Sequence, residues 1–205
     1  MRGERERSPL TFSHTLPHAE NRMRHTISIL VENEAGVLAR VAGLFSGRNF
    51  NISSLCVAET TDDTVSRITL VTDGDDQVVE QITKQLHKLI CVIKVVDFQD
   101  SPHVEREMAL IKVAPDERAR SEVLNIVSIF RAKVVDAGPR SYVIEVTGDE
   151  GKITAILELL RPLGVREVVR TGRVAIQRGV QVLSAANGGE TLELNKRKIH
   201  KEKAA

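Results

Sequence analysis

The sequence predicts an α+β fold in which the chain runs twice through the same order of strands and helices. Short stretches alternate apolar and polar residues, as strands with one buried face do. Longer stretches repeat apolar residues on one helical stripe. The two halves also share a transition from strand to helix, written VTDGDD at 71–76 and VTGDEG at 146–151. These observations together predict two similar units in tandem.

The first half opens with a strand at residues 26–31, where Ile27, Ile29 and Val31 alternate with other residues. A helix is predicted at 36–47, because its apolar residues share one stripe and a glycine stands at its end. The remaining elements of this half are strands at 51–59, 65–72 and 92–98 and a helix at 75–88.

The second half repeats this order after the polar stretch QDSPHVERE. Its predicted strands are at 108–114, 133–137, 142–147 and 165–170, and its helices are at 117–131 and 149–160. Each half therefore reads βαββαβ, which is the ferredoxin-like order. The predicted fold class is α+β, with two consecutive ferredoxin-like βαββαβ domains.

These elements divide the chain into two domains with polar ends. We expect a disordered extension over 1–23, a first domain over 24–99, a linker over 100–107, a second domain over 108–180 and a polar tail over 181–205. The first residues lack the apolar core of a signal peptide. Each sheet buries one face under helices and leaves the other face and its edges open, so we expect a homodimer.

The composition argues against several classes of function. With 29 basic and 28 acidic side chains the net charge is +1, so no overall field attracts nucleic acid or an anionic membrane. Aromatic residues form 3% of the chain and Trp is absent, which leaves few platforms for stacking bases. No apolar run is long enough to span a membrane. We expect a cytoplasmic protein whose cysteines, Cys56 and Cys91, are free thiols.

No set of residues predicts catalysis or metal binding. The histidines show neither HxxH nor HExxH spacing, and GDEGKIT at 148–154 lacks the GxxxxGK[ST] pattern of a phosphate loop. The acidic residues at 62–63 and 73–76 lack the ligand spacing of a calcium loop, so we expect them at turns and helix N-caps. We therefore expect no catalytic residue, no metal and no cofactor in this chain.

The stretch VENEAGVLARVAGLF leads an apolar strand through a polar elbow into a helix. A helix that begins at Gly36 presents unpaired N–H groups and the positive end of its dipole, which favour a carboxylate. Asn33 and Asn51 offer donors and acceptors for either end of an amino acid. An apolar rim would consist of Val37, Leu38 and Ile52. The residues alone leave two interpretations open, a simple turn with Asn33 as its cap or a site for an amino acid.

The stretch ISILVENEAGVLARVAGLFSGRNFNISSL resembles the opening of an ACT domain, a small-molecule-binding module of amino-acid biosynthetic enzymes. More specifically, FSGRNFNISSLCVAETTDDTVSRITLVTDGDDQVVEQITKQLHKLICVIKV is similar to the small regulatory subunit of acetolactate synthase (acetohydroxyacid synthase). HVEREMALIKV and VIEVTGDEGKITAILELLRPLGVREVVRTGRVAIQRG extend this resemblance through the second half, so that it covers residues 23–179.

The resemblance implies a non-catalytic subunit that works with a separate large subunit, which carries thiamine diphosphate, magnesium and FAD. In that family, the small subunit raises the activity of the large one and makes it sensitive to branched-chain amino acids, chiefly valine. The effector lies between two paired ACT domains. Transferred to this sequence, the effector-binding residues are Asn33, Ala35, Gly36, Val37 and Leu38 of one copy and Asn51 and Ile52 of the other.

Three other functions are considered. A free-standing amino-acid sensor would share the site but lack the enzyme partner. A DNA-binding regulator would need a basic recognition element, and the sequence shows neither a helix-turn-helix nor a basic ribbon. An acylphosphatase-like hydrolase would need an arginine in the elbow, which is acidic here.

Overall fold

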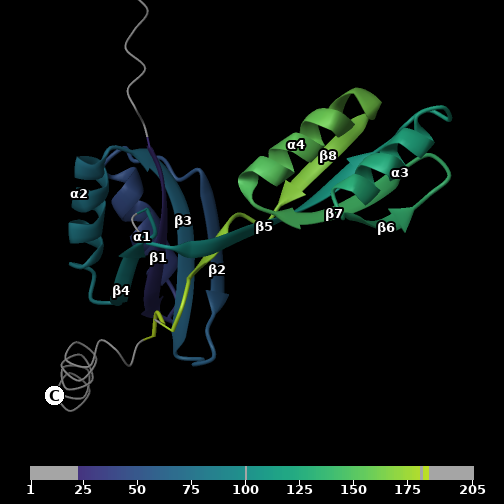
Figure 1. Ribbon diagram of the computed structural model, residues 1–205. Helices are drawn as coiled ribbons and strands as arrows, with labels where there is room; N and C mark the ends of the chain where they lie inside the picture. Colours follow the sequence, from purple (N-terminus) through teal and green to yellow (C-terminus); the bar gives the residue numbers. More distant parts are fainter. Residues whose placement is uncertain (1–22, 100, 181, 185–205) are drawn as a thin grey trace, which may run out of the picture.

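The computed structural model describes residues 23–99, 101–180 and 182–184. The predictions for the N-terminal extension before Met23, and for the tail from residue 185 onward, lie outside the described residues. Figure 1 shows two lobes, each a sheet with helices on one face, joined by one long strand and by a second segment that returns beside it. This arrangement confirms the predicted fold class of two consecutive ferredoxin-like units.

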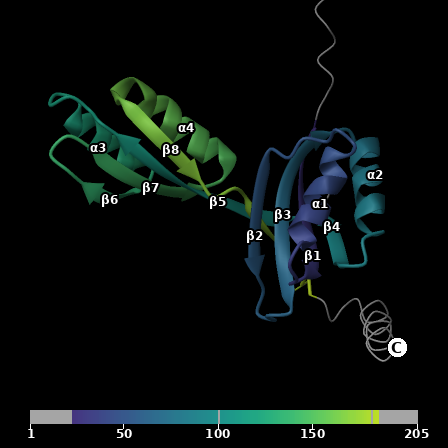
Figure 2. The same ribbon diagram turned by 180° about the vertical axis from the view of Figure 1, so that it is seen from behind.

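The first domain contains β1 (Met23–Glu32), α1 (Val37–Ser46), β2 (Ser54–Glu59), β3 (Val65–Gly74), α2 (Asp76–Leu86) and β4 (Val92–Asp97). Its strands lie in the order β2-β3-β1-β4, and β1 is antiparallel to both of its neighbours. Both helices cover the same face of this sheet, as the view from behind in Figure 2 also shows. Alternate residues of β1, including Ile27 and Ile29, are fully buried beneath these helices.

The second domain contains β5 (His103–Val113), α3 (Arg120–Ile129), β6 (Lys133–Ala137), β7 (Tyr142–Gly148), α4 (Glu150–Leu160), the short 3-10 helix η1 (Arg161–Leu163) and β8 (Val165–Arg170). The strand order β6-β7-β5-β8 repeats that of the first sheet. Ala109 and Ile111 of β5 lie fully buried under α3 and α4. Asp75 caps α2 as expected, because its side chain accepts a hydrogen bond from the backbone N–H of Val78. Asp149 caps α4 in the same way by accepting from the backbone N–H of Lys152.

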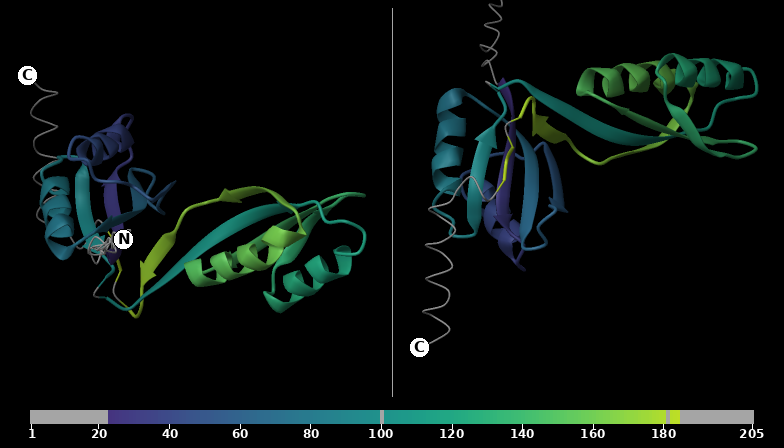
Figure 3. Two further views of the ribbon diagram at one scale, coloured as in Figure 1. Left: turned by 90° about the horizontal axis from the view of Figure 1, so that it is seen from above. Right: turned by 60° about the horizontal axis from the view of Figure 1, so that its bottom comes forward.

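A strand that the sequence did not predict connects the two domains. β9 (Val174–Gln177) pairs with the first residues of β5, from His103 to Arg106, inside the stretch that we expected to be a linker. Figure 3 shows this two-stranded ribbon leaving the first domain and running toward the second. The stretch HVERE does not show the apolar alternation of a strand. Its Glu105 faces polar partners, Thr26 and Arg173, where a strand with one buried face would have an apolar residue.

The ribbon covers the face of the first sheet that has no helices. Thr26, Ser28 and Leu30 point to this face, and they are only 6%, 0% and 1% exposed. The open face that we expected a second copy to cover is therefore partly covered within the same chain. Among the described residues, no helix is long and apolar enough to cross a lipid bilayer.

Candidate functional site

The elbow between β1 and α1 is held in place by the side chain of Asn33. Its Nδ2 donates to the carbonyl oxygen of Asp63 at 2.8 Å and to Oε1 of Glu59 at 3.1 Å. Its Oδ1 accepts from Oγ of Ser66 at 2.9 Å. Both ends of the amide are thus bonded to the β2–β3 hairpin. Asn33 shapes the elbow, and it does not cap α1.

Gly36 forms the N-cap of α1 in the left-handed conformation, with φ of 85° and no side chain over the helix end. A Cβ built on Gly36 would meet nothing within 4 Å, so the space in front of this helix terminus is open. The first turn of α1 contains no acidic side chain that would neutralise the dipole. This terminus can therefore receive a carboxylate group.

Acidic side chains flank the same elbow. Partial burial, followed by the nearby charge of Glu34, raises the pKa of Glu32, while Arg40 opposes this shift. A negative environment beside a positive helix end suits a zwitterion, whose ammonium group faces the carboxylates while its carboxylate faces the N–H groups.

The apolar members of the predicted site are divided between the core and the surface. Val37 is 3% exposed and belongs to the core of the first domain, whereas Leu38 is 41% exposed. Ile52 is partly buried against the same core, and Ala35 is exposed. Leu38 is thus the residue that offers free apolar surface next to Gly36.

A single copy of the chain does not bring all predicted site residues together. The elbow lies at the end of β1 where Glu32 pairs with Val65. Asn51 lies at the other end of the sheet, where its carbonyl oxygen accepts from Oγ1 of Thr72 at 2.7 Å. Seven residues of β3 separate these points, which corresponds to about 23 Å along an extended strand. Asn51 and Ile52 cannot contact a small ligand at the elbow of their own chain.

Sequence reasoning missed two features that lie between distant parts of the chain. The first is a cavity of about 810 Å³ between the first sheet and the β5–β9 ribbon, with a mostly apolar wall that includes Leu30, Val104 and Ile176. Arg67 also lines it, and burial lowers the pKa of this guanidinium group. No motif could reveal this cavity, because its walls come from separate stretches.

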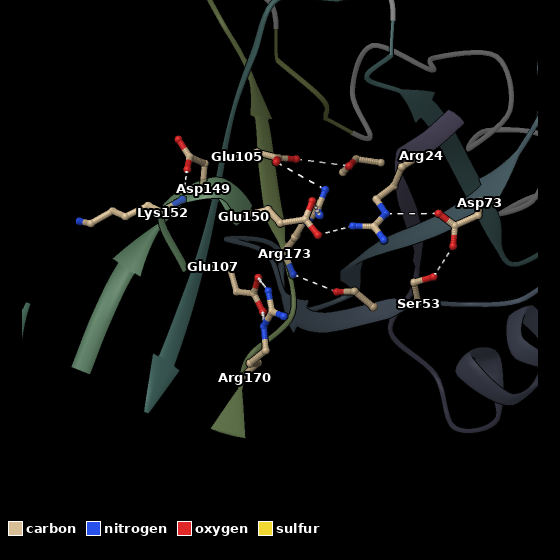
Figure 4. A network of polar contacts seen from close by, with 12 residues as sticks. Arg24, Ser53, Asp73, Glu105, Glu107, Asp149, Glu150, Lys152, Arg170 and Arg173 are labelled. Atoms are coloured by element: carbon tan, nitrogen blue, oxygen red, sulfur yellow. Dashed lines mark hydrogen bonds and ion pairs between the residues drawn. The ribbon is translucent and has the colours of Figure 1, made fainter. Parts of the chain in front are cut away.

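The second feature is a group of charged residues between the two domains, shown in Figure 4. We call it the interdomain clamp, and it consists of Arg24, Asp73, Glu105, Glu150 and Arg173. A cavity of about 300 Å³ lies beside it. The ion pair between Arg24 and Glu150 joins residues 126 positions apart, a separation that no local pattern can indicate.

The described residues contain no group of three or more His, Cys, Asp or Glu side chains that could hold a metal ion. The buried His25 instead bonds through Nδ1 to Oδ2 of Asp97 at 2.8 Å. Both cysteines are free thiols in the structure.

Comparisons with known proteins agree with this architecture. Residues 27–94 match a family model described as the AHAS small subunit-like ACT domain, and residues 106–179 match one described as the small subunit of acetolactate synthase. The acetolactate synthase small subunit of Aquifex aeolicus is 53% identical over 165 residues, which cover 80% of this chain and 86% of that protein.

A second relative, the probable acetolactate synthase small subunit of Archaeoglobus fulgidus, is 54% identical over 77% of this chain and 98% of its own length. The crystal structure of the acetolactate synthase small subunit from Thermotoga maritima superposes with a TM-score of 0.72 at 42% identity, covering 78% of this chain and 99% of that one. The resemblance inferred from the sequence is confirmed: this chain belongs to the acetolactate synthase small-subunit family.

Proposed function

We propose that this chain is the regulatory subunit of an acetolactate synthase in the cytoplasm. It binds a separate catalytic subunit, which carries thiamine diphosphate, magnesium and FAD, and it raises the activity of that subunit. It also makes the enzyme sensitive to valine, an end product of branched-chain amino-acid biosynthesis. The observation that carries this proposal is the match of both domains to the small-subunit family at more than 50% identity.

The proposed effector site requires two copies of the chain. β2 is an edge strand, and its Leu55 and Val57 are 36% and 42% exposed on the side that carries the helices. An exposed apolar edge of this kind is suited to pair with the same edge of a second copy. Such pairing would bury these side chains and join the two sheets into one.

Antiparallel pairing of two β2 strands would also bring the separated site residues together. The elbow is bonded to the end of β2 through Asn33 and Glu59. Asn51 lies just before the start of β2 at Ser54. A two-fold axis between the strands places the end of one beside the start of the other. The elbow of each copy then faces Asn51 and Ile52 of its partner.

Valine is proposed to bind with its carboxylate at the N-terminus of α1 and its side chain against Leu38. Binding across the interface favours one arrangement of the paired domains, and inhibition follows if the catalytic subunit is less active in that arrangement. A coupling free energy of roughly 1–3 kcal/mol is enough for the usual range of allosteric effects.

The Gly36→Asp substitution tests this proposal. The carboxylate of the aspartate would occupy the open space before α1 and repel the carboxylate of valine. Calorimetric titration should show that valine binding is lost, and activation of the catalytic subunit should persist in an assay without valine. Gly36→Asn is the matched control, because it places a side chain of the same shape at the same positive φ without the negative charge, and it should bind valine more tightly than Gly36→Asp. Unchanged inhibition by valine in the Gly36→Asp enzyme would refute the site.

A further inference from the structure

Glu150 occupies the centre of the interdomain clamp. It is the first residue of α4 in the second domain, and its carboxylate lies between two guanidinium groups. Oε1 accepts from Nη1 of Arg24, which belongs to β1 of the first domain. Oε2 contacts Nη2 of Arg173, in the segment that enters β9. Glu150 thus ties three parts of the fold together (Figure 4).

The surroundings favour the ionised form of Glu150. Partial burial alone would raise its pKa, but the hydrogen bond from Arg24 and the charge of Arg173 outweigh burial and lower the pKa. Arg173 is only 8% exposed and also reaches Oε1 of Glu105 at 3.5 Å. A buried guanidinium group depends strongly on its carboxylate partners, because its charge has lost most of its hydration.

The clamp continues into the segment that precedes and begins β2. Arg24 donates from Nε to Oδ1 of Asp73 at 3.2 Å, and Oδ2 of Asp73 accepts from Oγ of Ser53 at 2.8 Å. Nδ2 of Asn51 lies 3.5 Å from the same Oγ. One series of polar contacts therefore joins the proposed effector residue Asn51 to Glu150.

A second connection to Glu150 begins at Ser54, the residue that follows Ser53. The backbone N–H of Arg173 donates to Oγ of Ser54 at 3.0 Å, and the side chain of Arg173 contacts Glu150. A movement of residues 51–54 would shift both Ser53 and Ser54. Both connections would then change the position of the same carboxylate.

We propose that Glu150 is a positioning residue that transmits effector binding at Asn51 to the second domain. This inference rests on the proposed function and adds the path by which the site acts. In the effector-free state, the clamp holds α4 against the first domain. When residues 51–54 close on the effector, the clamp rearranges and the second domain takes a different orientation toward the catalytic subunit.

The clamp has the properties of an element with two arrangements. The Glu150 side chain is 39% exposed, so water can replace the guanidinium groups when the ion pairs separate. The Arg24–Glu150 pair is exposed on both sides and contributes little to stability, so a ligand can shift it at small cost. The buried Arg173 keeps Glu105 as a second carboxylate partner when Glu150 moves. The covalent connections through β5 and the β8–β9 segment keep the domains linked in either state.

The coupling between valine binding and the catalytic subunit is measured as a ratio of two dissociation constants. The Kd of valine in the presence of the catalytic subunit is divided by its Kd for the isolated full-length chain. Glu150→Gln keeps the shape of the side chain and removes its charge. Glu158→Gln is the matched control, because Glu158 lies exposed on the same helix and outside the clamp. We expect Glu150→Gln to leave the Kd of the isolated chain within about threefold of the wild type. The ratio should fall by fivefold or more, toward one.

A second variant and a structural measurement keep the test decisive. Ser53→Ala breaks the contact with Asp73 without removing any charge, and it should also lower the ratio. Hydrogen exchange at the amide of Arg173 should become at least fivefold faster in Glu150→Gln and stay unchanged in Glu158→Gln. A folded Glu150→Gln chain with the wild-type ratio would overturn the inference. Failure of the wild type to bind valine would refute the proposed function itself, and the inference with it.

Discussion

Replacing Asn33 with alanine separates a structural role of this residue from a direct role in ligand binding. The structure shows that its amide already bonds to Asp63, Glu59 and Ser66 of the β2–β3 hairpin. Asn33→Ala should therefore destabilise the isolated protein in the absence of any effector. Weaker effector binding would then follow from a displaced elbow.

The expected magnitude follows from the three hydrogen bonds that are lost. The contacts with Glu59 and with the Asp63 carbonyl group are exposed, so water replaces them and their contribution is small. Ser66 is only 7% exposed, and the substitution leaves its Oγ without the acceptor that Asn33 provides. An unsatisfied buried hydroxyl group of this kind should lower the free energy of unfolding by about 1–3 kcal/mol.

Urea denaturation followed by circular dichroism at fixed protein concentration measures this change. Asn125→Ala is the control, because Asn125 is exposed on α3 and its replacement should change the free energy by less than about 0.5 kcal/mol. In a double-mutant cycle, Asn33→Ala and Ser66→Ala should show a coupling of about 0.5–1.5 kcal/mol. Additive effects, or a stability loss no larger than that of Asn125→Ala, would contradict the structural role of Asn33.

Three further predictions concern backbone strain, assembly and pH. Gly164→Ala should destabilise the second domain by at least about 1–3 kcal/mol in thermal unfolding, because its φ is 94° and the new Cβ would lie 2.7 Å from the carbonyl oxygen of Ala114. Val57→Glu should convert the proposed dimer to a monomer in analytical ultracentrifugation, because the charge would lie on the β2 edge; a dimer that persists in this variant would refute pairing through β2. The lowered pKa of Glu150 means that its ion pairs persist above the ordinary value of 4.5 and are lost as pH falls through the lowered value. Small-angle X-ray scattering should therefore distinguish the wild type from Glu150→Gln at pH 7, and this difference should disappear as the pH falls through the lowered pKa.

The elements within each domain could be predicted because their signals are local. Ile27, Ile29 and Val31 alternate because β1 has one face under the helices, and this face buries all three residues. Asp75 and Asp149 indicated the helix starts because an aspartate at the N-cap accepts a backbone N–H group of the first turn. These features depend on residues only a few positions apart.

The ribbon of β5 and β9 could not be predicted in the same way. Val174 and Ile176 line the cavity and are still 48% and 59% exposed, while the charged Glu105 bonds to Thr26 of the first domain. Alternation in this segment therefore does not separate apolar from polar residues. The pairing of His103 with Gln177 spans the whole second domain and leaves no local trace in the sequence.

The candidate site shows the same limit at the level of single residues. The sequence located the elbow, because Gly36 and the start of α1 are neighbours in the chain. It assigned Asn33 to helix capping or to a ligand, whereas the structure assigns its amide to the hairpin at Asp63 and Ser66. Only long-range contacts decide where an amide points.

The distance between the elbow and Asn51 also explains why such an effector would change how strongly two copies of the chain pair. If all contacts came from one copy, valine could bind without any change in how the copies pair. Because about 23 Å of strand separates the two parts within a copy, a ligand that needs both must bridge two copies. Its binding free energy is then coupled to the pairing of the β2 edges, and through Ser53 and Asp73 to the interdomain clamp.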